Sequence, residues 1–124
     1  MELALLYTEM VMALFFFVAG GSKLFWGREA LIAINPYAAE FSDTGFRWFG
    51  IGEFAASFGL VLPIFVGGLE LLAPISAAVL VVLQGSAGLL HWRATKNRAY
   101  LIFTLLLLAG LMFIIWGRLG SYPL

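Results

Sequence analysis

The chain has 124 residues, of which 63% are hydrophobic and only 11% are charged, and its mean hydropathy is +1.02. This composition exceeds what a soluble domain of this length needs for its core, so we expect a protein that lies in a lipid bilayer. A formal net charge of zero gives no basis for binding nucleic acid, and the absence of cysteine excludes disulfides, iron–sulfur ligation and thiolate nucleophiles in this chain alone.

Four apolar segments are long enough to cross a membrane, since about 20 apolar residues span the roughly 30 Å hydrocarbon layer. We place these spans at residues 3–25, 46–66, 70–91 and 99–117. A β-barrel would need short segments of alternating polarity, and the last span, which contains LIFTLLLLAGLMFII, has no such alternation. The predicted fold is therefore an all-α transmembrane four-helix bundle, with residues 1–124 as a single integral membrane domain.

The first span carries two charged residues, Glu9 near its start and Lys23 near its end. With only Tyr7 close by in the sequence, Glu9 is expected to be a protonated or water-exposed acid at the interface. The long connection that follows has its own apolar patch at residues 30–34 and is predicted to lie along the membrane surface. Candidate caps for the second span come next: Ser42, Asp43 and Thr44.

The second span places a carboxylate, Glu53, among apolar residues. An ionised residue at the centre of a span costs roughly 2.5–3.5 kcal/mol on insertion scales, so Glu53 needs a proton or a partner. If Trp26 and Trp48 mark one interface, Lys23 and Glu53 differ by only about 3 Å in depth, because each helical residue rises 1.5 Å. The sequence therefore predicts that Lys23 and Glu53 meet between neighbouring helices.

The third span adds Gln84 and His91, which lie two helical turns apart on one face. Small residues stand one turn from Lys23, from Glu53 and from His91, and Ser57 is one of them. Because small residues mark the faces where membrane helices approach closely, these polar side chains are expected to point into the bundle. One His and no Cys leave no intrinsic metal or haem site to expect.

The basic residues indicate an orientation. Six of the seven flank the first and third connections: Lys23, Arg28, Arg47, Arg93, Lys96 and Arg98. The positive-inside rule then predicts a multi-pass protein of the cytoplasmic (inner) cell membrane with both termini outside and those two loops in the cytoplasm.

Two interpretations of the polar cluster remain open on the residues alone. In one, Lys23 and Glu53 form a structural ion pair, while Gln84 and His91 satisfy neighbouring helices. In the other, Lys23, Glu53, His91, Gln84 and Ser57 line a pocket that binds the polar head of a lipophilic ligand.

The polar positions resemble those of a known family. The segment FFFVAGGSKL at 15–24, Gly50-x-x-Glu53, Gly59-Leu60, Pro63 and a histidine that closes the third span are similar to the DoxX-like family of small four-helix membrane proteins. The resemblance covers roughly residues 10–117, and Lys23, Glu53 and His91 are the positions carried over from it.

The family takes its name from a subunit of a thiosulfate:quinone oxidoreductase, so the resemblance implies a quinone ligand and a redox partner protein. Sulfur chemistry does not carry over, because the chain has no cysteine. A quinone would find donors in Lys23 and His91, and aromatic walls are predicted at Phe16, Phe54 and Phe58. The alternatives are an accessory subunit that docks another membrane protein, and a homo-oligomer that transports small solutes.

Overall fold

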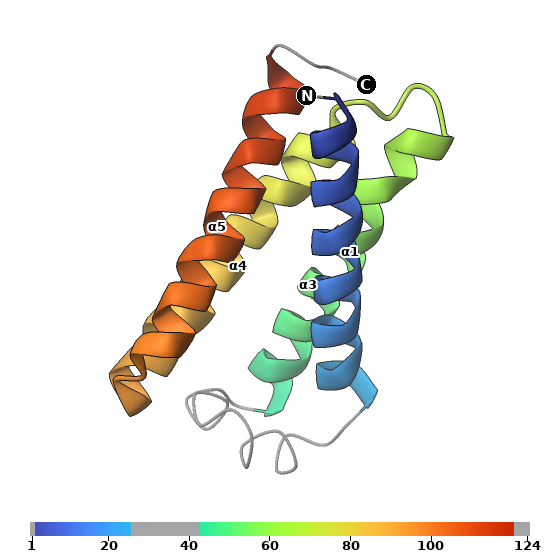
Figure 1. The fold of residues 1–124 in the computed structure, drawn as a ribbon. Coiled ribbons are helices and arrows are strands. Elements are labelled where there is room, and N and C mark those ends of the chain that lie inside the picture. The colour runs from blue at the N-terminus through green and yellow to red at the C-terminus, as the bar shows by residue number, and fades with distance from the viewer. Residues whose placement is uncertain (1, 26–42, 121–124) are drawn as a thin grey trace.

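The computed structural model describes residues 2–25 and 43–120, which form four helices in chain order. Their bounds are α1 Glu2–Phe25, α3 Asp43–Phe65, α4 Leu72–Thr95 and α5 Arg98–Leu119. All four are long and apolar enough to cross a membrane, which confirms the predicted all-α fold. They run up and down in turn, so that the start of α1 and the end of α5 lie at the same end (Figure 1).

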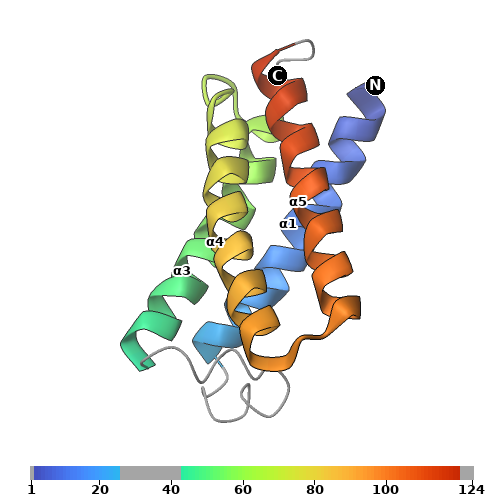
Figure 2. The ribbon, with the colours of Figure 1, turned by 90° about the vertical axis from the view of Figure 1, so that its left-hand side faces the viewer.

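We call that end of the bundle the terminal end. The opposite end, called the basic end, holds the end of α1, the start of α3 and the turn between α4 and α5 (Figure 2). Arg93, Lys96 and Arg98 are exposed there. The predicted surface loop and the candidate cap Ser42 lie outside the described residues, as does Trp26. The other two candidate caps, Asp43 and Thr44, already belong to α3.

The third span differs from its predicted range of 70–91. Helix α4 begins at Leu72, because Glu70 belongs to the turn after α3, where its carboxylate accepts a hydrogen bond of 3.1 Å from the backbone N–H of Gly68. The helix continues past His91 to Thr95 and stops at Lys96, whose φ of 55° is left-handed. Asn97 then caps α5, since its side chain accepts hydrogen bonds from the backbone N–H groups of Ala99 and Tyr100.

Close approach of the helices depends on glycine. Helix α1 packs mainly on α3, and α4 mainly on α5. A Cβ atom on Gly20 would lie 2.5 Å from the backbone nitrogen of Phe54, and one on Gly88 would lie 2.5 Å from a methyl carbon of Thr104. Helices in lipid lack a hydrophobic drive to associate, so the van der Waals contact that such close approach allows contributes to their association.

The core contains both apolar and polar side chains. Its apolar centre includes Phe16, Leu60, Leu80 and Leu111. The polar residues buried around it are Glu9, Lys23, Glu53, Ser57, Ser76, Gln84, His91, Thr104 and Arg118. Large apolar side chains are exposed on the outside of the helices, as expected where the surrounding solvent is hydrocarbon.

Candidate functional site

The predicted contact between Lys23 and Glu53 is confirmed. The ammonium nitrogen of Lys23 lies 2.7 Å from Oε1 of Glu53, and the two side chains are 8% and 2% exposed. Lys23 also faces the carbonyl oxygen of Ala19 at 3.5 Å and lies 5.5 Å from the centre of the Phe49 ring. The paired charges therefore neutralise each other inside the apolar bundle.

Glycine brings this pair together. A Cβ atom on Gly50 would lie 2.7 Å from Cβ of Lys23 and 3.1 Å from the carbonyl oxygen of Gly20. Gly20 and Gly50 thus allow the backbones of α1 and α3 to touch beside the pair. The short side chain of Glu53 can then reach Lys23 without leaving its helix face.

A polar cavity lies beside the ion pair, in the basic half of the bundle. Its volume is about 260 Å³, and all four helices contribute to it. The described residues that line it are Phe15, Ala19, Ser22, Lys23, Glu53, Gln84, Tyr100 and Phe103. A charged pair on the wall of a cavity can interact with a third group, whereas a sealed pair can interact only with itself.

Gln84 and His91 have different places in relation to this cavity. Gln84 lines it and donates a hydrogen bond of 3.4 Å to the hydroxyl of Thr104 on α5. His91 is buried behind Tyr100, with the two ring centres 3.7 Å apart and the planes 20° from parallel. His91 therefore supports a wall of the cavity through Tyr100.

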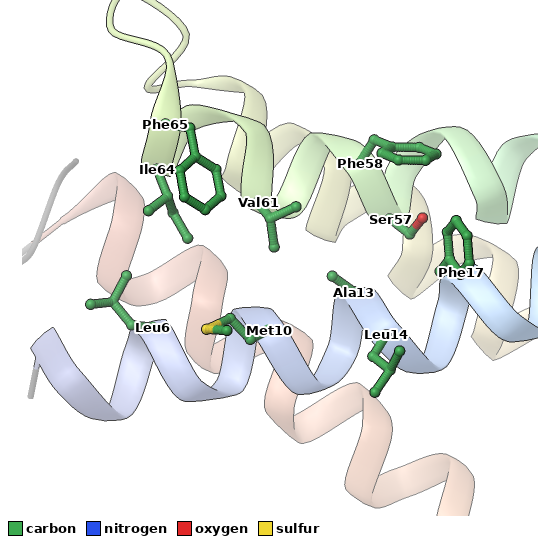
Figure 3. Close-up of a pocket in the computed structure, with 10 residues that line it drawn as sticks. All are labelled: Leu6, Met10, Ala13, Leu14, Phe17, Ser57, Phe58, Val61, Ile64 and Phe65. Carbon is green, nitrogen blue, oxygen red and sulfur yellow. The ribbon is translucent and has the colours of Figure 1, made fainter.

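Ser57 is not brought to the cluster. Its hydroxyl donates a hydrogen bond of 2.6 Å to the carbonyl oxygen of Phe54, one turn back in the same helix. Figure 3 shows Ser57 in a separate groove, where side chains of α1 and α3 face each other. This groove of about 440 Å³ is otherwise lined by hydrocarbon side chains and methionine sulfur.

The predicted aromatic walls are wrong. Phe16 is fully buried in the apolar core, and Phe54 and Phe58 pack against Phe17 on another side of α1. The rings that line the cavity are those of Phe15 and Phe103, which meet edge to face with centres 5.4 Å apart. Sequence spacing does not separate the adjacent Phe15 and Phe16, because each lies seven residues before a polar residue, Ser22 and Lys23 respectively.

A second buried ionic cluster lies at the terminal end and corrects the prediction for Glu9. Glu9 is fully buried and pairs with the guanidinium of Arg118 on α5, which also contacts Glu2 at 2.7 Å. The side chains of Glu9 and Arg118 are both 0% exposed. A carboxylate without a partner would have needed water, and Arg118 removes that need.

Among residues 2–25 and 43–120, no three or more His, Asp or Glu side chains are close enough to hold a metal ion.

The comparisons with known proteins agree with this architecture. The sequence profile of the DoxX-like family matches residues 7–114, which include all of α3 and α4, most of α1 and α5, and the Lys23–Glu53 pair. The chain belongs to the DoxX-like family. It is thus a multi-pass membrane protein of that family. Neither the curated proteins nor the solved structures gave a match.

Proposed function

We propose that this DoxX-like protein is a membrane subunit that binds the polar head of a lipophilic ligand, and that a quinone is the ligand that fits best. The observation that carries the proposal is the position of the Lys23–Glu53 pair on the wall of a cavity of about 260 Å³. An ion pair whose only role is to join α1 and α3 would not require an open space beside it.

The lining residues match the chemistry of a quinone head, which is a flat ring with two carbonyl acceptors. Lys23 and Gln84 carry N–H donors on different helices, and Tyr100 adds a hydroxyl. Phe15 and Phe103 offer ring surfaces for the flat faces of the ligand. The wall thus combines polar groups with three aromatic rings, and convergent polar groups of this kind fix the orientation of a bound ligand.

A quinone exchanges two electrons and two protons when a redox partner is present. In this chain, the carboxylate of Glu53 could hold a proton beside the ring, while Lys23 keeps the opposite charge within reach. The electrons would come through a partner subunit, because one His and no Cys give the sequence no ligands for a haem or cluster of its own. On the positive-inside rule, the cavity would lie toward the cytoplasm.

Quinone content of purified protein tests the proposal. The wild type and Lys23→Met would be reconstituted into nanodiscs that contain quinone, and the retained quinone would be measured by mass spectrometry. We expect Lys23→Met to lose most of it. Lys96→Met, at an exposed lysine of the same end, is the matched control and should retain the wild-type amount. Equal retention by all three proteins would exclude a quinone site at Lys23.

A second candidate is an accessory subunit that docks another membrane protein. It is favoured by α5, which buries the smallest share of its apolar stretch among the four described helices. Purification in mild detergent should then recover one partner in a fixed ratio, and quinone retention should not depend on Lys23.

A further inference from the structure

We infer that the ligand carries a hydrocarbon tail, and that the tail lies in a shallow apolar groove on the outer surface of α1. This inference rests on the proposed function, because it assigns a place to the part of the ligand that the polar cavity cannot hold.

The groove adjoins the polar cavity. It has a volume of about 430 Å³ and is lined by Val11, Leu14, Phe15, Val18 and Ala19. Phe15 and Ala19 also line the polar cavity, so the two spaces meet at these side chains. A molecule with its head beside Lys23 would have its next atoms at Phe15 and Ala19.

The two spaces differ sharply in chemistry. The cavity contains an ion pair, an amide and two hydroxyl-bearing side chains, whereas every side chain of the groove is hydrocarbon. Val11, Leu14 and Val18 are each more than half exposed on the outside of the helix, where lipid would surround them. A polar head and an apolar tail on one molecule match this pair of spaces.

Two aromatic rings stand between the cavity and the lipid at the seam between α1 and α5. Phe15 and Phe103 meet across it, both line the cavity, and Phe103 is 41% exposed. A ligand that enters sideways from the bilayer at this seam would have to part the two rings but would not have to cross a helix.

The groove between α1 and α3 in Figure 3 has a different role. It shares Leu14 with the tail groove, so the apolar surface continues around α1. Its hydroxyl, on Ser57, already donates to Phe54. This second groove could take the far end of a long tail but offers no site for a head.

The role of the tail groove is steric. Hydrocarbon gains little free energy on moving from lipid to an apolar protein surface. The groove instead leaves room for the tail while the head occupies the cavity. Filling the groove should therefore exclude ligands that have a tail and leave binding of tail-less ligands unchanged.

Two variants test this. Val18→Phe fills the groove with an apolar side chain at a position that is 59% exposed and does not line the cavity. Val82→Phe makes the same change on α4, where Val82 is 67% exposed, and controls for ligand partition into the bilayer. Each would be compared with wild type in nanodiscs for binding of a tail-less benzoquinone and of the same ring with a decyl chain.

We expect Val18→Phe to weaken binding of the decyl probe by about tenfold, the size of an overpacking effect, and Val82→Phe to leave it unchanged. Binding of the tail-less probe should be equal in all three proteins. Val11→Phe, at the other part of the same groove, should repeat the effect of Val18→Phe. If the tail-less probe binds too weakly to detect, selective loss of the decyl probe in the two groove variants supports the inference equally.

Other results would overturn it. If wild type binds both probes and Val18→Phe binds them as wild type does, the tail lies elsewhere, although the proposed function survives. If Val18→Phe instead changes the oligomeric state, a second copy of the chain occupies the groove. If wild type binds neither probe, the proposed function itself fails, and the inference fails with it.

Discussion

The two buried ionic clusters of this protein both involve α1, yet they differ in what surrounds them. At the terminal end, Glu9 and Arg118 have no exposed side-chain surface. At the basic end, Lys23 and Glu53 lie on the wall of a polar cavity. Both clusters remove unpaired charge from an apolar environment, so charge pairing alone does not distinguish a structural joint from a binding site.

The packing of α1 explains the difference. Near the basic end, α1 closes on α3, where Gly20 faces Phe54 and Gly50. Near the terminal end it closes on α5, where Leu5 lies against Gly117. Because α1 contacts α3 tightly at the basic end, space remains there toward α4 and α5, and the ion pair borders it.

The largest effect is expected from Arg118→Met. It leaves Glu9 buried without its cation, and loss of one partner of a buried pair costs about 3–5 kcal/mol. The free energy of unfolding in mixed detergent micelles would measure this loss. The double variant Glu9→Met, Arg118→Met should recover most of it, because two apolar residues need no partner. A small loss in the single variant would show that Glu9 does not depend on Arg118.

Lys23→Met should lower the free energy of unfolding by less, about 1–3 kcal/mol. The reason is that Glu53 borders a cavity, where water can solvate its charge or a proton can neutralise it. The same unfolding measurement applies. A loss as large as that of Arg118→Met would show that the pair at the basic end is as sealed as the other, and would argue for a structural joint.

A comparison of two glycines tests the packing of α1. In Gly20→Ala the new methyl group would meet backbone atoms of Phe54 and Gly50 at 2.5 and 2.8 Å, which cannot turn away. In Gly117→Ala it would meet the end of the Leu5 side chain, which can rotate. Gly20→Ala should therefore be less stable by about 1–2 kcal/mol than Gly117→Ala.

Gly85→Ala is the control for this pair, since a Cβ there has no heavy atom within 4 Å. It should leave stability unchanged or raise it slightly, because alanine favours helix. If all three variants have the same free energy of unfolding, close approach at Gly20 does not determine how α1 packs against α3.

Glu70 is an exposed carboxylate. Removing its charge should change the stability less than the substitutions in the two buried ionic clusters do. Hydrogen bonds from its own backbone N–H and from that of Gly68 hold the pKa of Glu70 below its ordinary value. A lowered folded-state pKa stabilises the fold above the unfolded-state pKa, and the contribution disappears as pH falls through the folded-state value.

Glu70→Gln should accordingly lower the unfolding temperature slightly at neutral pH and have no effect once wild-type Glu70 is protonated. Thermal scans of both proteins across the acidic range would measure this. A difference that persists at the lowest pH would come from something other than the charge of Glu70.

Some site residues were predictable and others were not. Lys23 and Glu53 are predicted to lie at similar depths from the same membrane interface, and the cost of a lone charge in lipid required a partner. Glu9 and Arg118 are 109 positions apart, so the residues around Glu9 in the sequence do not show its partner. Both lie near the outer ends of their spans, and this shared depth is the feature of the sequence that points to the pair.

The sequence by itself determined the number of spans, their helical form and the pairing of Lys23 with Glu53, because length and polarity against a bilayer are properties of the linear chain. Only the tertiary structure decided which of the adjacent Phe15 and Phe16 faces the cavity and where α1 leaves space beside a charge. Successive helical residues differ by about 100° in direction, and the rotation and crossing of each helix follow from contacts, such as those of Gly20 and Gly117, that form only when the helices pack.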